Sequence, residues 1–195
     1  MGEDLNMASD MPIEISRRGI LRAFAACTVA ATPVYANAAG YLKGAGDARK
    51  LWLYSRRSGE EVETVYWVDG EYIDEAVIEI SRLMRDWRRN EIKIIDHRTL
   101  DVMSACQTVM DSSQPFQLLS GYRSPQTNAM LRRKSRRVAR NSLHMTGQAA
   151  DIRMSNRSTR QIARAAISCR AGGVGRYSRS GFVHLDCGPV RSWRG

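Results

Sequence analysis

The chain has only three histidines in 195 residues, and two of them lie in segments suited to binding a metal ion. His144 precedes Asp151 by seven residues, within a string of the pattern S-x-H-x-x-G-x-A-x-D. His184 is the first residue of an H-x-D pair in a short apolar segment. A lone histidine is more often structural than ligating, but the long string followed by H-x-D is far more specific. His97 has no such partner motif, and we expect it in a surface loop.

Two imidazoles and one carboxylate suit a tetrahedral zinc ion whose fourth position is open to water, which is the arrangement of a catalytic site. Zinc would polarise a substrate carbonyl and lower the pKa of water toward 7. In a strand, alternate residues share a face, so Asp186 should point the same way as His184, and a neighbouring strand could direct Asp151 toward both. We therefore expect His144, Asp151 and His184 to bind Zn²⁺.

Two further residues are candidates for catalysis. Asp186 is the carboxylate nearest to the ligands in sequence and could act as general base. It could instead orient a metal ligand without touching the metal. Arg123 follows an apolar segment and could stabilise an oxyanion or hold a substrate carboxylate.

Apolar periodicity indicates the elements that must position these residues. Alternating β-branched and aromatic residues predict a β-hairpin over 51–68. Helical spacing predicts a core-facing helix from Asp74 to Trp87, ending before Asn90, and another over 101–110. The remaining expected elements are strands at 116–119, 149–154 and 182–185, and helices at about 126–133 and at 158–171, the latter capped by Ser158.

This mixture contains no internal repeat, no regular βαβ alternation and no glycine-rich phosphate loop. It predicts a single α+β domain with a small antiparallel sheet flanked by helices and a zinc cleft. We place this domain at residues 48–195 and a linker at 39–47.

The first 38 residues have the layout of an export signal. A basic segment with the pair Arg17-Arg18 precedes an apolar stretch at 23–31 and a small-residue site at 36–38. The arginine pair before Ile-Leu is typical of a twin-arginine signal, which is read by a receptor and is not an anchor. We therefore expect a periplasmic protein without a transmembrane span. An amphipathic or frayed tail is the alternative.

The chain is basic, with 30 Lys and Arg against 20 Asp and Glu and a formal net charge of +10. Such a charge favours polyanionic partners, among them nucleic acid, anionic lipid and carboxylate-bearing peptidoglycan. An export signal argues against nucleic acid. The basic run at 132–140 is either a solvated loop or a surface that attracts peptidoglycan carboxylates. Beyond residue 38 the cysteines are Cys106, Cys169 and Cys187, an odd number that permits at most one disulfide among them.

The string at 142–151 resembles the zinc motif of bacterial D-alanyl-D-alanine peptidases and murein endopeptidases, whose fold is similar to the Hedgehog-type zinc fold. Further segments at 120–125, 128–133, 172–177 and 181–189 resemble the murein endopeptidase K group over most of 48–195. The resemblance implies cleavage of peptide cross-links in peptidoglycan, with His144, Asp151 and His184 as zinc ligands and Arg123 near the substrate carbonyl. The related carboxypeptidases have a glutamate three residues before the last histidine, where this chain has Gly181.

Three hypotheses follow from these features. The first is an exported zinc endopeptidase that cuts peptidoglycan cross-links, with a carboxypeptidase that trims stem peptides as a variant. The second is a zinc-containing, non-catalytic peptidoglycan-binding module, which the absence of a glutamate at Gly181 permits. The third, a nucleic-acid-binding protein, depends only on the basic run at 132–140.

Overall fold

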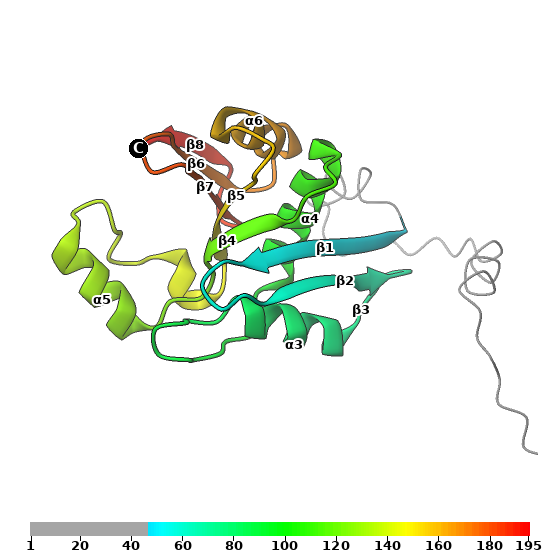
Figure 1. Cartoon of the computed structure of the whole chain (residues 1–195), viewed down its shortest axis with the longest axis horizontal. Coiled ribbons are helices and arrows are strands. Elements are labelled where there is room, and N and C mark those ends of the chain that lie inside the picture. The colour runs from blue at the N-terminus through cyan, green and yellow to red at the C-terminus, as the bar shows by residue number, and fades with distance from the viewer. Residues whose placement is uncertain (1–46) are drawn as a thin grey trace, which may run out of the picture. The chain divides into compact units, whose positions relative to one another are not determined.

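The computed structural model describes residues 47–195, and the expected export signal and nearly all of the linker lie outside these residues (Figure 1). The described chain is an α+β domain built on one sheet, as expected. No helix in this part of the chain is long and apolar enough to cross a membrane. The strands are β1 (Ala48–Ser55), β2 (Glu61–Val68), β3 (Glu71–Tyr72), β4 (Phe116–Ser120), β5 (Ala149–Arg153), β6 (Gly173–Tyr177), β7 (Phe182–Asp186) and β8 (Arg191–Arg194). The helices are α3 (Asp74–Leu83), α4 (His97–Met110), α5 (Pro125–Lys134), the 3₁₀ turn η1 (Leu143–Thr146) and α6 (Thr159–Cys169).

The sheet is larger than the small antiparallel sheet expected from the sequence, and it is mixed. Its eight strands follow the order β3-β2-β1-β4-β5-β7-β6-β8. The pairs β1–β4 and β6–β8 are parallel, and all the other pairs are antiparallel. The sequence does not show β6 or β8 because β6 contains two glycines and β8 is largely polar, which hides the β-branched pattern of a strand.

The buried core lies between the sheet and three helices. In the described structure α3 contacts β2, α4 contacts β1 and β7, and α6 contacts β6 and β7, while α4 and α6 also pack on each other. The largest fully buried side chains come from both layers: Tyr66, Phe116, Leu51, Leu53, Ile80, Met84, Ile95, Leu100, Met103, Ile152, Ile162 and Leu185. Val183 and Leu185 of β7 are among the buried residues of this cluster, so the alternate residues of β7 point to the other face of the sheet.

Two helix boundaries differ from the prediction. The first helix ends at Leu83, and Trp87, expected in the core, is 39% exposed. The chain turns there because the buried Asp86 carboxylate accepts hydrogen bonds from the backbone N–H of Arg88 and of Ser124. The second helix begins at His97, four residues earlier than expected, because Asp96 caps it by accepting from the N–H of Arg98.

His97 is consequently not in a loop: it opens α4, and its ring stacks on Tyr72 with centroids 3.9 Å apart. The helical spacing over 101–110 predicts Val109 on the same face as Val102 and Cys106, but Val109 is 53% exposed. Cys106 lies on the face that the helical spacing predicts to be buried, and it is fully buried as a small apolar residue. Among the described residues none of Cys106, Cys169 and Cys187 forms a disulfide.

Candidate metal centre

The strand pairing places the expected ligands in one row across the sheet. Asp151 of β5 is directly opposite His184 of β7, His184 is opposite Gly175 of β6, and Gly175 is opposite Trp193 of β8. Directly paired residues point to the same face of a sheet. The row therefore faces away from the layer of α4 and α6, because Val183 and Leu185 on either side of His184 are buried in the core.

His144 reaches this row from η1. Its ring is buried, and Nδ1 lies 2.7 Å from the carbonyl oxygen of Gly121. The backbone carbonyl of His144 accepts a hydrogen bond from the N–H of Arg123 at 3.1 Å. The loop that carries Arg123 is held in turn by the buried Asp86, which accepts from Ser124. Two loops that are distant in sequence thus fix the third ligand.

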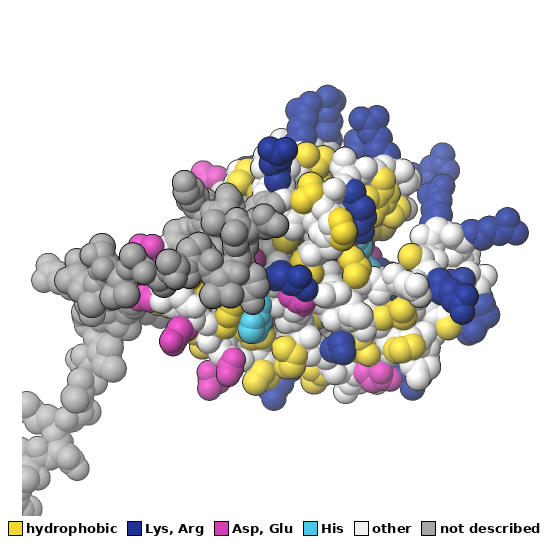
Figure 2. Space-filling view, turned by 180° about the vertical axis from the view of Figure 1, so that it is seen from behind, with side chains coloured by type: hydrophobic (Ala, Val, Ile, Leu, Met, Phe, Trp, Pro, Cys, Tyr) yellow, Lys and Arg dark blue, Asp and Glu magenta, His cyan; other side chains and the backbone are white. Residues whose placement is uncertain are grey.

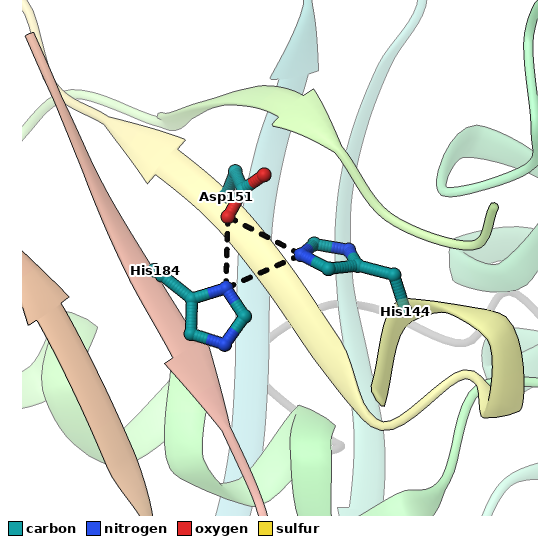
Figure 3. A group of neighbouring side chains, drawn as sticks. All are labelled: His144, Asp151 and His184. Carbon is teal, nitrogen blue, oxygen red and sulfur yellow. Dashed lines mark hydrogen bonds and ion pairs between the residues drawn. The ribbon is translucent and has the colours of Figure 1, made fainter. Parts of the chain in front are cut away.

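The three side chains converge on one point, as Figure 3 shows. His184 Nδ1 lies 2.9 Å from Asp151 Oδ1 and 3.2 Å from His144 Nε2, and His144 Nε2 lies 3.3 Å from Asp151 Oδ1. Adjacent ligands of a tetrahedral zinc with bonds of ~2.0–2.1 Å are separated by about 3.3 Å. The spacing of the donor atoms therefore fits a zinc-sized ion.

The protonation pattern also fits a cation. His144 Nδ1 donates to a backbone carbonyl, so its Nε2 carries a lone pair. His184 Nε2 faces a carboxylate oxygen of Asp186 at 3.0 Å, which places the proton of the neutral ring there and leaves a lone pair on Nδ1. Two nitrogen lone pairs and a carboxylate oxygen then meet with no donor between them. A cation satisfies all three at once.

Burial and charge perturb the ionisation of this group. Burial lowers the pKa of His144. Burial also disfavours the protonated form of His184, but the carboxylates of Asp151 and Asp186 outweigh this effect and raise its pKa to about 9. The pKa of Asp151 is held well below its usual range because the two imidazoles and Arg123 overcome the cost of burying the carboxylate. In the metal-free chain a proton on His184 thus takes the place of the cation.

Arg123 lies at the site, as predicted, and contacts a ligand. Its guanidinium forms an ion pair with Asp151 Oδ2, and its Nε donates to the hydroxyl of Ser120 at 2.8 Å. This contact occupies one carboxylate oxygen and leaves Oδ1 for the metal.

Asp186 lies behind His184 rather than beside the ligand atoms. It is fully buried, and Oδ1 accepts hydrogen bonds from the N–H of Gly173 at 3.0 Å and of Gly188 at 2.9 Å. Arg191 of β8 donates to both of its oxygens, at 2.7 and 3.1 Å. Burial of the carboxyl raises the pKa of Asp186, but hydrogen bonds from His184, Arg191 and the N–H of Gly188 outweigh burial and hold this pKa below its usual range.

Arg191 and Trp193 are site residues that the sequence did not reveal. Both belong to β8 and reach their partners on β7 across β6, which lies between the two strands. The crossing is possible because β6 has glycine at both crossing points: a Cβ on Gly173 would lie 2.4 Å from Asp186 Oδ2, and one on Gly175 would lie 2.5 Å from the indole of Trp193. The indole reaches the His184 ring, with centroids 5.4 Å apart.

The alternating pattern G-x-G at 173–175 with R-x-W at 191–193 is the signal that could have indicated this arrangement.

Other expected features lie at the edge of the site or away from it. The basic run at 132–140 covers the last turn of α5 and the loop after it, and most of it is exposed. Cys187 is half-buried, and its sulfur accepts a hydrogen bond from Thr99 at 3.4 Å. It is not one of the three residues that converge on the ligand point.

Comparison with known proteins agrees with this geometry. The family described as peptidoglycan L,D-endopeptidase MepK matches residues 43–193. The peptidoglycan L,D-endopeptidase MepK of Escherichia coli (strain K12) is 42% identical over 145 residues, which are 74% of this chain and 80% of that protein. The probable peptidoglycan L,D-endopeptidase MepK of Haemophilus influenzae is 42% identical over 114 residues, which are 58% of this chain and 61% of that protein. The chain therefore belongs to the MepK family of peptidoglycan L,D-endopeptidases.

Proposed function

We propose that this protein is an exported, zinc-dependent endopeptidase that hydrolyses L,D peptide cross-links of peptidoglycan during remodelling of the cell wall. The observation that carries the proposal is the convergence of His144 Nε2, Asp151 Oδ1 and His184 Nδ1 on one point, in a chain whose family acts on such bonds. Three protein ligands leave one position free, which is the arrangement of catalytic rather than structural zinc. A zinc ion at this point supplies Lewis acidity toward the scissile carbonyl and a water of lowered pKa.

We assign Arg123 two tasks. Its ion pair with Asp151 Oδ2 fixes the carboxylate so that the other oxygen points at the ligand position. The guanidinium has five N–H donors, and those not used by Asp151 and Ser120 can receive the oxygen of the scissile carbonyl as negative charge develops on it. A conservative Arg123→Lys change cannot perform both tasks, since lysine presents a point charge without the planar fork.

We assign Asp186 a positioning role rather than that of general base. A base must reach the attacking water on the ligand side of His184, where Nδ1 points. Asp186 contacts the other ring nitrogen, and its oxygens are occupied by Arg191 and two backbone N–H groups. A carboxylate in that place fixes the tautomer and the orientation of a metal-binding imidazole.

Digestion of isolated, deproteinised peptidoglycan tests the proposed function. The full chain loaded with zinc should release cross-link cleavage products that chromatography and mass spectrometry separate from undigested material. His144→Ala should abolish both zinc binding and turnover. His97→Ala is the matched control, because this imidazole stacks on Tyr72 and takes no part in the converging group. A zinc-loaded chain that binds peptidoglycan but releases no product would support the non-catalytic module instead.

Release of single stem-peptide residues without loss of cross-links would support the carboxypeptidase.

Export to the periplasm by the twin-arginine route is part of the same proposal and is supported by the arginine pair at 17–18 and the apolar stretch after it. Replacing both arginines by lysine keeps the charge and removes the motif. The chain should then stay in the cytoplasmic fraction. Unchanged periplasmic recovery of that variant would reject this route.

A further inference from the structure

A second, strongly basic groove lies between α6 and the edge of the sheet. Its volume is ≈ 520 Å³, and its walls include Arg160, Arg164 and Ile167 of α6, Arg176 of β6 and Arg194 of β8. Along β8, Arg194 follows Trp193, and along β6, Arg176 follows Gly175, so both arginines point away from the metal-binding row. The groove therefore opens on the face of the sheet that α6 covers. The proposed zinc ligands lie on the opposite face, near the same edge.

The arrangement of these arginines is unfavourable for the isolated protein. Arg176 and Arg194 are directly opposite each other on paired strands, and Arg160 and Arg164 are four residues apart on one helix. Like charges at both kinds of position repel. None of the four guanidinium groups forms an ion pair or hydrogen bond with another residue in the described part of the chain. An anionic ligand in the groove would relieve this repulsion.

The neighbouring basic residues add to the positive electrostatic potential of the groove. From residue 132 to residue 195 the chain has fifteen Lys and Arg but only two acidic residues, Asp151 and Asp186, and both are buried at the metal site. In the view of Figure 2, dark blue Lys and Arg side chains lie along the top and right of the described domain, and magenta Asp and Glu side chains lie mainly toward the lower left. No acidic side chain in this third of the sequence is exposed.

We propose that the groove binds a carboxylate-bearing peptidoglycan strand outside the cross-link that is cut. This inference rests on the proposed function, because it names a second contact with the same polymer. The stem peptides of peptidoglycan carry carboxylates, and carboxylates form charge-assisted hydrogen bonds with guanidinium groups such as the four in this groove. A concave site admits an extended chain, whereas a flat bilayer surface would meet only its rim. Ile167, which is 48% exposed, supplies apolar contact beside the charges.

Trp193 connects the groove to the metal site. It is one of the residues that line the groove, while its indole lies on the opposite face of β8, with its ring centroid 5.4 Å from that of His184. A strand held by the groove would thus lie close to the ligands without contacting the zinc. The groove raises the affinity for the intact polymer and leaves the chemical step on a small soluble substrate unchanged.

The test compares two variants of the full, zinc-loaded chain with equal loss of charge. The groove variant carries Arg160→Gln, Arg164→Gln and Arg194→Gln, all at exposed positions. The control variant carries Arg132→Gln, Arg133→Gln and Arg136→Gln at the end of α5 and just after it. Co-sedimentation with intact deproteinised sacculi measures binding at several salt concentrations, and a soluble cross-linked muropeptide dimer measures turnover.

The groove variant should bind sacculi about tenfold more weakly at low salt, as expected for three solvent-exposed charge contacts of modest strength each, and the difference should shrink as salt is added. The control variant should bind more tightly than the groove variant, and both should cleave the soluble dimer at the wild-type rate. Equal losses in both variants would show that net charge alone matters and would overturn the groove. Wild-type binding of sacculi by the groove variant would overturn it too.

Failure of the wild-type chain to cleave the soluble dimer would instead reject the proposed endopeptidase.

Discussion

Replacing Asp186 by asparagine should weaken zinc binding rather than remove a base. The amide oxygen of the new side chain can keep the hydrogen bonds from Gly173 and Gly188. Its NH₂ group must then face Arg191 Nη2 and His184 Nε2, which lie 2.7 and 3.0 Å from the present oxygen. Both of these nitrogens are hydrogen-bond donors in the native protein, so in the variant the amide NH₂ faces two other N–H donors with no acceptor between them. His184 relieves one conflict by moving its proton from Nε2 to Nδ1, which is the atom that must bind the metal.

The expected loss follows from this tautomer change. Removal of a group that orients a metal-binding histidine typically lowers the metal affinity by 10–100-fold, which is about 1.4–2.7 kcal/mol. Competition with a chromophoric zinc chelator measures the dissociation constant directly. Turnover of the soluble dimer should recover substantially when zinc is raised to saturate the variant.

Asp101→Asn is the matched control for this experiment. Asp101 is a second carboxylate that is mostly buried; it is bound by Arg49, Tyr66 and Tyr72 and does not belong to the group that converges with His184. The control removes the same charge and should leave zinc affinity unchanged. An Asp186→Asn protein with native zinc affinity and a turnover that zinc cannot restore would refute the positioning role and identify Asp186 as the base.

Three further predictions concern the pH response, β6 and α6. Because the pKa of His184 is raised to about 9, the metal-free protein holds an extra proton on this ring at pH 7. Zinc uptake should therefore release about one proton, and zinc affinity should fall as the pH drops below 9. Calorimetry in buffers of different ionisation enthalpy measures both quantities, and release of no proton would contradict the assignment of His184 as a ligand. Gly175→Ala should push the Trp193 indole off His184 and shift its fluorescence, whereas an unchanged spectrum would show that β6 tolerates a Cβ there. Ser158→Ala should lower the free energy of unfolding by about 1 kcal/mol in urea titrations, because it removes the capping box of α6, and an unchanged midpoint would show that the cap contributes nothing.

The convergence of His144, Asp151 and His184 could be predicted from the sequence because its signal is local. His144 and Asp151 lie in one short string, and strand alternation correctly put His184 and Asp186 on one face. The hairpin β1–β2 and the capped helix α6 were also predicted, since apolar periodicity and caps act over a few residues.

The features that the sequence did not reveal depend on contacts between distant segments. Arg191 looks like an ordinary charged residue, and its partner Asp186 becomes visible only when β8 is known to lie beyond β6. The end of the first helix depends on Asp86, whose carboxylate accepts from Ser124, 38 residues away. Each arginine of the groove is ordinary by itself, and only the parallel pairing of β6 and β8 brings Arg176 and Arg194 together.

Metal binding at this site would also depend on the register of the strands, because two of the three converging side chains belong to the row formed by Asp151, His184, Gly175 and Trp193. A slip of one residue between β5 and β7 would turn His184 toward the core and Val183 toward the solvent, and the three ligands would no longer meet. A zinc ion that bound only the correctly aligned state would stabilise that state by mass action, by about 2.7 kcal/mol at a free concentration of 100 times the dissociation constant. Misaligned molecules would gain nothing from the ion, so supply of zinc during folding would select the molecules whose three ligand atoms meet.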